Sequence, residues 1–109
     1  MMTAVTQPTT SDIHDRRRPV PPAAMARLKA IADPARLTML LLLAESRDAL
    51  CVCEFQRALG VEQPTVSHHL RVLREAGLVV SKREGSWIYS SLAPDTSLWV
   101  RAVLAGLPR

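Results

Sequence analysis

Hydrophobic residues recur every three or four positions along most of this chain, which is the spacing of helices that bury one face. The first such segment covers residues 23–32, where the apolar positions include Met25, Leu28 and Ile31. Asp33 and Pro34 end it, because aspartate is a preferred N-cap and proline fits the first position of a following helix. That second helix is expected over residues 34–45. It is apolar nearly all round, so we predict that it is the central helix of the core.

Two shorter helices joined by a tight turn are predicted in the middle of the chain. The first covers residues 54–59 and must stop at Gly60, because glycine adopts the left-handed conformation beyond a helix end at little cost. A turn over residues 60–62 follows, with the length of a helix-turn-helix corner. The second helix carries apolar residues at spacings of four, three and four, which places them on one face. These residues are Val66, Leu70, Leu73 and Gly77.

The opposite face of this second helix is polar. It carries His68 and Arg71, flanked by Gln63, Ser67 and Arg74 on one side and Thr65 on the other. In a helix-turn-helix motif the N-terminal residues of the second helix contact base edges in the major groove, and hydrogen-bonding side chains suit that contact. The residues predicted to bind DNA are Gln63, Thr65, Ser67, His68 and Arg71. The alternative is a two-helix corner whose polar face is only solvated.

A β-hairpin is predicted after the two helices. Two short β-prone runs, LVVSK and WIYSSL, are separated by residues 83–86, where a glycine permits the positive φ of hairpin turns. A hairpin after a recognition helix is a wing, so the expected fold is mainly α with a β-hairpin wing, a winged helix-turn-helix. Lys82 and Arg83 are expected at the tip of the wing, where they reach phosphates beside the groove.

Length and composition agree with one small domain that pairs with itself. The 109 residues allow a single domain, expected over residues 23–109, and 48% of them are hydrophobic, more than a monomer of this size readily buries. The net charge of +4 favours a polyanionic partner. Residues 1–22 are polar and proline-bearing, which predicts a flexible arm. Its arginines at residues 16–18 either contact DNA or are solvated.

The sequence indicates neither secretion, nor membrane insertion, nor catalysis. Two cysteines only two residues apart argue against a disulfide framework, and there is no secretory segment or apolar run of spanning length, so we expect a cytoplasmic protein. An acid/base dyad, a phosphate-binding glycine loop and a nucleophile with a base are all absent, so we expect no enzyme. His68 and His69 diverge by about 100° on a helix and cannot share one ion. We expect His69 to face the packed flank.

Cys51 and Cys53 are the only thiols, and they are expected at the start of the third helix. Residues two apart on a regular helix project about 200° apart, so both sulfurs cannot reach one ion while that turn stays helical. An ion held by both would therefore distort the helix start and misplace the recognition helix, as a switch requires. A thiolate near a helix N-terminus is also stabilised by the helix dipole. The plain alternative is cysteine as a small buried hydrophobe.

The runs CVCEF, VEQPTVSHHLRVLREAGLVVSKREGSWIYSSL and ADPARLTMLLLLAE resemble the arsenical-resistance repressor (ArsR/SmtB) family. The likeness covers about residues 24–105 and implies a homodimeric winged-helix repressor that binds double-stranded operator DNA and responds to metal ions. The CVC run resembles the arsenic-binding motif of the family. This implies As(III) or Sb(III) as inducer at Cys51 and Cys53, with no permanent cofactor, and thiolates suit such soft ions.

One position departs from the pattern of that family. Arsenic-responsive relatives commonly supply a third thiol three residues after the second, where this chain has Gln56. The site then uses two thiolates with water, a small thiol or Glu54, or it has another specificity, or it has decayed. A zinc site on the C-terminal helix, expected over residues 94–107, lacks histidine ligands. The apolar residues of that helix are expected to form the dimer together with the first helix.

Two alternative functions remain open. The first is a repressor of the same fold whose thiols respond to an oxidant, or to other soft ions such as Hg(II) or Cd(II). The second is a protein-interaction module that uses the winged fold without DNA, although the basic wing and the polar helix face argue against it.

Overall fold

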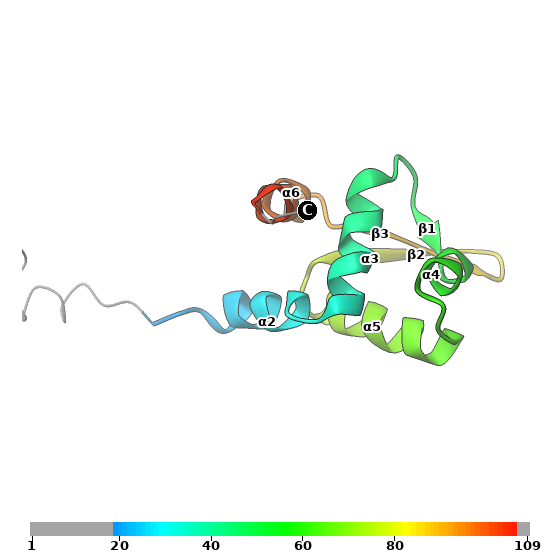
Figure 1. Ribbon diagram of the computed structural model, residues 1–109, viewed down its shortest axis with the longest axis horizontal. Coiled ribbons are helices and arrows are strands. Elements are labelled where there is room, and N and C mark those ends of the chain that lie inside the picture. Colours follow the sequence, from blue (N-terminus) through cyan, green and yellow to red (C-terminus); the bar gives the residue numbers. More distant parts are fainter. Residues whose placement is uncertain (1–18, 107–109) are drawn as a thin grey trace, which may run out of the picture.

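The structure, a computed structural model, describes residues 19–106, which form five helices and one three-stranded sheet (Figure 1). In chain order the elements are α2 (Pro22–Ile31), α3 (Pro34–Glu45), β1 (Leu50–Cys51), α4 (Val52–Leu59), α5 (Gln63–Glu75), β2 (Val79–Glu84), β3 (Trp87–Leu92) and α6 (Thr96–Ala105). In Figure 1, α3 stands at the centre, α2 and α6 lie toward one end, and α4 and the hairpin turn lie toward the other. The predicted winged helix-turn-helix fold is confirmed. Residues 1–18 of the predicted arm lie outside the described residues.

The break between α2 and α3 follows from Asp33 and Pro34. The Asp33 carboxylate accepts a hydrogen bond from the Arg36 backbone N–H at 3.0 Å, which satisfies one of the donors left open at the start of α3. Pro34 is the first residue of α3. A backbone N–H at that position has no partner within the helix, so proline loses no hydrogen bond there. The bounds predicted from this pair, residues 34–45, are confirmed.

α3 passes through the core, but it is not buried on all sides. Met39, Leu40 and Leu43 are at most 5% exposed, whereas Leu41 is 39% exposed. The prediction of a central core helix therefore holds for one side of α3. The other side brings an apolar residue to the surface of the single chain.

The other elements complete the core from their inward faces. Among these residues are Phe55 from α4, Val66, Leu70 and Leu73 from α5, and Leu78 before β2, each at most 2% exposed. Burying a side chain of this size stabilises the fold by about 1.5–3 kcal/mol. The recognition helix is therefore held from behind by the same core that contains α3 and α4.

The wing is a regular hairpin with a two-residue turn. β2 and β3 pair along their full length, from Val79 opposite Leu92 to Glu84 opposite Trp87. The turn therefore consists of residues 85 and 86 alone, and Gly85 has the positive φ of +62° that such a turn requires. The predicted turn over residues 83–86 was too long, because the first two of its residues continue β2.

β1 is a third strand that the sequence did not predict. It contains two residues, Leu50 and Cys51, which pair antiparallel with Ser90 and Tyr89 of β3. The strand order is β1-β3-β2, so β3 lies between the wing strand β2 and the segment that leads into α4. The N-cap of α4, Cys51, and the wing therefore belong to one sheet.

α6 is shorter than predicted and is only partly covered. It extends from Thr96 to Ala105, and residue 107 at the end of the predicted range lies outside the described residues. Val100 is 2% exposed in the core, whereas Leu98 is 80% exposed. Within residues 19–106, the structure contains no helix with the length and apolarity needed to cross a membrane.

Candidate nucleic-acid interface and thiol site

α5 presents the predicted polar face to solvent. Gly60 follows α4 with φ +68°, and its N–H donates to the Gln56 carbonyl at 2.8 Å, so the chain turns sharply toward α5. The inward face of α5 is buried, as predicted from its spacing. The side chains predicted to contact DNA are all exposed: Gln63, Thr65, Ser67, His68 and Arg71. They lie together on one helix, away from the core.

Gly77 does not belong to the buried face of α5, so this part of the prediction is wrong. α5 ends at Glu75, and Gly77 has φ +76° in the turn beyond the helix. The Leu78 N–H then donates to the Leu73 carbonyl at 3.0 Å, which closes the helix end. Gly77 instead provides the left-handed turn that leads from the recognition helix into the wing.

His69 connects α5 to α3 and, through Arg36, to α2. Its Nδ1 lies 3.3 Å from Nη1 of Arg36 on α3, and Nε of Arg36 donates to the Ala30 carbonyl of α2 at 2.6 Å. Burial lowers the pKa of His69; the Asp33 carboxylate opposes this shift, and Arg36 and His68 add to it. A neutral His69 ring can accept the hydrogen bond from the guanidinium. His69 therefore lies on the packed flank, and His68 points outward.

Acidification is expected to weaken the fold through His69. Its pKa is lowered from the ordinary value of 6.5, so its contribution to stability is present above pH 6.5 and is lost as the pH falls through the lowered pKa. We therefore expect the Tm of the wild type to fall more than that of His69→Gln between about pH 8 and about pH 5. His68→Gln, which alters the exposed ring, should follow the wild type. Equal falls in the wild type and His69→Gln would contradict this role.

Lys82 and Arg83 lie within β2, and they point to opposite faces of the hairpin because neighbouring strand residues alternate. Neither is at the tip, which corrects their predicted position. Ser81 lies on the Arg83 face and accepts a hydrogen bond from Nη1 of Arg74 on α5 at 3.5 Å. Arg83 is therefore on the recognition-helix side of the wing, and Lys82 is on the other side, opposite Tyr89.

The thiol pair has a geometry that the sequence did not predict. Cys51 is the N-cap of α4 and has an extended backbone (φ −83°, ψ 164°), whereas Cys53 lies in the first turn of the helix. Their Cα atoms are 5.4 Å apart and their sulfurs form a disulfide. The prediction that the sulfurs diverge is therefore wrong, because only one of the two residues is helical.

The surroundings of the pair give its two sulfurs different access to solvent. Cys51 is 6% exposed, whereas Cys53 is exposed. The Glu54 carboxylate accepts a hydrogen bond from the Cys51 backbone N–H at 3.0 Å, as in a capping box, which stabilises the start of α4. Reagents therefore reach the pair from the Cys53 side, and reduction leaves two neighbouring thiols at a helix N-terminus.

The donor groups near the pair suit a soft ion held by two protein ligands. Within the part of the chain that the structure describes, no three His, Cys, Asp or Glu side chains gather to hold a metal ion. Glu54 is engaged with the Cys51 N–H, so the structure gives no support for Glu54 as the third ligand. Two thiolates fit a thiophilic ion whose remaining bonds go to water or to a small thiol.

Cys51 also belongs to the sheet that carries the wing. It lies opposite Tyr89, which in turn lies opposite Lys82. Residues directly opposite on antiparallel strands share a face, with Cβ atoms about 4.5–5.5 Å apart. A row of three side chains thus crosses the sheet from the thiol pair to the wing. Sequence reasoning missed Tyr89, whose only signal was its place in a β-prone run.

Comparisons with known proteins agree with this architecture. Residues 33–81 match the family described as bacterial regulatory protein, arsR family. The chain is 46% identical over 79 residues to the arsenic resistance transcriptional regulator ArsR1 of Pseudomonas putida, covering 72% of this chain and 61% of that protein. It is 40% identical over 76 residues to the arsenical resistance operon repressor of Escherichia coli, covering 70% and 64%. The matched part thus spans a little under two thirds of both relatives.

A solved structure with the same arrangement of elements is the homodimeric winged helix-turn-helix DNA-binding domain of a possible ArsR-family transcriptional regulator from Mycobacterium bovis. The two superpose with a TM-score of 0.69 and 28% sequence identity, covering 94% of this chain and 88% of that one.

Proposed function

Because the chain belongs to the arsR family of bacterial regulatory proteins, we propose that it is a transcriptional repressor that binds operator DNA as a homodimer. We propose further that As(III) or Sb(III) releases the DNA by binding the reduced thiolates of Cys51 and Cys53. The family consists of regulators rather than enzymes, which confirms the expectation that the chain is not an enzyme. A protein that binds operator DNA must be where that DNA is, so we expect it in the cytoplasm.

The exposed polar face of α5 supports DNA binding. Its hydrogen-bonding side chains are exposed rather than packed in the core. Arg71, Arg74 and Arg83 lie on or beside this face. Arg71 and Arg83 suit phosphates, and Gln63, Thr65, Ser67 and His68 suit base edges. In a symmetric dimer the two copies of α5 enter successive major grooves about one helical turn apart. Lys82 faces away from α5 and reaches phosphates only on the other side of the wing.

The single observation that carries the inducer proposal is the convergence of the Cys51 and Cys53 sulfurs at the start of α4. Two relatives bear names that assign them to arsenic or arsenical resistance. A trivalent soft ion needs neighbouring thiolates, and this pair provides two of them with α4 intact. Solvent access at Cys53 gives the ion a way in.

We infer that the switch acts through Cys51, which has three roles at once. It is a thiol ligand, the N-cap of α4 and one of the two residues of β1. When both reduced sulfurs bond one ion, the ion fixes the distance between them, and the cap and the short strand shift with Cys51. β1 has only two residue pairs to hold it, so a small shift separates it from β3 and disturbs the wing. The two states then differ in the geometry of the DNA-binding surface, as a switch requires.

Titration of the reduced protein on its operator tests this proposal. The DNA is a duplex that the wild-type chain selects from random sequence, and the added ions are As(III), Sb(III), Cd(II), Hg(II) and Zn(II). We expect As(III) and Sb(III) to lower operator affinity by roughly 5–150-fold, the usual range of allosteric coupling, and Zn(II) to have no effect.

Two results would contradict the proposal at different points. Release by Cd(II) or Hg(II) with none by As(III) or Sb(III) would show that the inducer is wrong. Failure of the wild type to select any duplex would show that DNA binding is wrong.

The disulfide between Cys51 and Cys53 favours a second candidate trigger, oxidation. Two thiols would give up two electrons and two protons to hydrogen peroxide, which leaves as two molecules of water, and the sulfur–sulfur bond forms. In that case peroxide releases the operator without any metalloid, and a dithiol reductant restores binding. Release by peroxide combined with no response to As(III) would favour this candidate over the first.

A further inference from the structure

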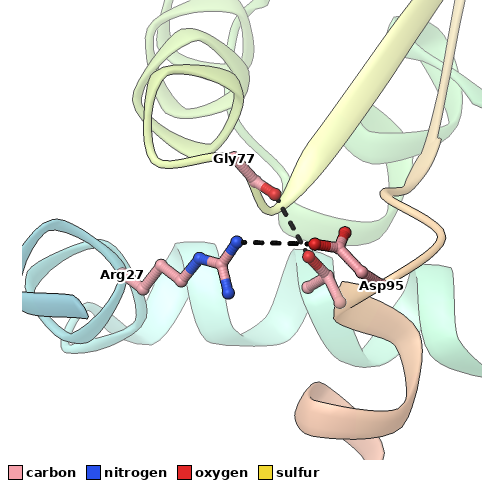
Figure 2. A network of polar contacts seen from close by, with 4 residues as sticks. Arg27, Gly77 and Asp95 are labelled. Carbon is pink, nitrogen blue, oxygen red and sulfur yellow. Dashed lines mark hydrogen bonds and ion pairs between the residues drawn. The ribbon is translucent and has the colours of Figure 1, made fainter. Parts of the chain in front are cut away.

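The turn behind the recognition helix meets α2 and α6 at one place, which we call the Thr96 junction (Arg27, Gly77, Asp95 and Thr96). The Thr96 hydroxyl at the start of α6 donates to the Gly77 carbonyl at 3.1 Å, and Nη2 of Arg27 on α2 lies 3.8 Å from Oδ2 of Asp95. Figure 2 shows Arg27 extending from its helix toward Asp95, with Gly77 on the turn above them. Segments far apart in the sequence are thereby joined.

Thr96 is the buried part of this junction. It is 0% exposed, and its hydroxyl donates to the carbonyl of a glycine held at φ +76°. A Cβ added at Gly77 would lie 3.7 Å from Nη2 of Arg27, so the guanidinium packs directly against this turn. The Ala93 N–H donates to the Leu78 carbonyl at 3.0 Å, which holds the chain before α6 beside the same turn. The C-terminal end of α5 is thus fixed to the beginning of α6.

α6 also contacts α3. Val100 enters the core, and Nη2 of Arg101 donates to the Ala44 carbonyl at 3.1 Å. α2 and α6 also carry exposed apolar side chains, among them Leu28 at 47% and Leu98 at 80% exposure. These are the surfaces that the proposed dimer would bury.

We propose that Thr96 is a positioning residue that sets the separation of the two recognition helices, and hence the spacing of operator half-sites that the dimer accepts. This inference rests on the proposed function as a dimeric DNA-binding protein. The hydroxyl contacts no DNA. It acts by holding α5 to α6, and α6 belongs to the dimer surface.

The test compares Thr96→Val, which keeps the shape and removes the donor, with Thr96→Ser, which keeps the donor. Affinities are measured for the duplex selected by the wild type, for the same duplex with one base pair added or removed between half-sites, and for a single half-site. We expect Thr96→Val to lose roughly fivefold to tenfold in affinity for the selected duplex, the size of one hydrogen bond. Its affinity for the altered spacings and the half-site should change less than about twofold. Thr96→Ser should behave as the wild type.

A purely structural role for Thr96 predicts something different. Thr96→Val would then weaken binding to all of the duplexes and to the half-site by the same factor, which would overturn the proposal. If Thr96→Val does not fold, Arg27→Ala replaces it, because this variant removes the guanidinium that packs against the same turn. Unchanged discrimination between spacings in Arg27→Ala would also overturn the proposal. Failure of the wild type to select any duplex would instead refute the proposed DNA binding itself.

Discussion

Replacing Cys53 with serine is expected to abolish release of the operator by As(III), while the free protein still binds DNA with nearly the affinity of the wild type. In the proposed site Cys53 supplies one of the two thiolates, and a hydroxyl is a poor ligand for a soft ion. The side chain is exposed, so its loss leaves the core and the cap at Cys51 intact. The roughly 5–150-fold effect expected of the inducer should therefore disappear.

Operator affinity measured with and without As(III), with the protein reduced, checks this result. Ala58→Ser is the matched control, because it places a serine at another exposed position of α4 and retains both thiols. Cys51→Ser should also lose the response. A response in Cys53→Ser equal to that of the wild type would place the inducer elsewhere.

Replacing Phe55 with alanine should have the largest effect on stability. Phe55 is 0% exposed and packs between α4 and the rest of the core, and Phe→Ala at such a site costs about 3–5 kcal/mol. Since domains are stable by about 5–15 kcal/mol, the variant should be largely destabilised. The free energy of unfolding from urea denaturation, at a fixed protomer concentration, measures the loss.

Arg57→Ala is the control for this measurement. Arg57 is exposed on the same helix, and its removal should change the free energy of unfolding by at most about 0.5 kcal/mol. A loss below about 1 kcal/mol for Phe55→Ala would mean that α4 contributes little to the core.

The parts of the fold that the sequence predicted well are those with strong local signals. Asp33 and Pro34 determine where α3 begins, because a side-chain cap and a fixed φ act within one turn. The buried face of α5 follows from spacing alone, since Val66, Leu70 and Leu73 must share a face in any regular helix. Gly60 also ends α4 for a local reason, its positive φ.

The geometry of the thiol site was not predicted, because it depends on a helix boundary. Placing Cys51 inside the helix makes the two sulfurs diverge, whereas placing it one position outside, as N-cap, lets them meet. Such boundaries vary by one or two residues for reasons that lie outside the local sequence. Here the reason is the pairing of Cys51 with Tyr89 of β3, a contact between distant parts of the chain. A strand of two residues shows no alternation that would reveal it.

The position of Lys82 and Arg83 was mistaken for a related reason. The glycine in the run 83–86 correctly indicated a turn, but the number of residues in that turn depends on how far β2 and β3 pair. The Thr96 junction was also beyond sequence reasoning, because a buried threonine has no spacing that identifies its partner.

The alternation along β2 places a restriction on how this wing can change in length. Inserting one residue into β2 before Lys82 would exchange the faces of Lys82 and Arg83, since side chains alternate between the two faces of a strand. The positive charge beside the recognition helix would then become an ammonium group rather than a guanidinium. Only insertions of an even number of residues at that place keep Arg83 on the side of the recognition helix. The orientation of the two cations therefore depends on whether the number of inserted residues is even or odd.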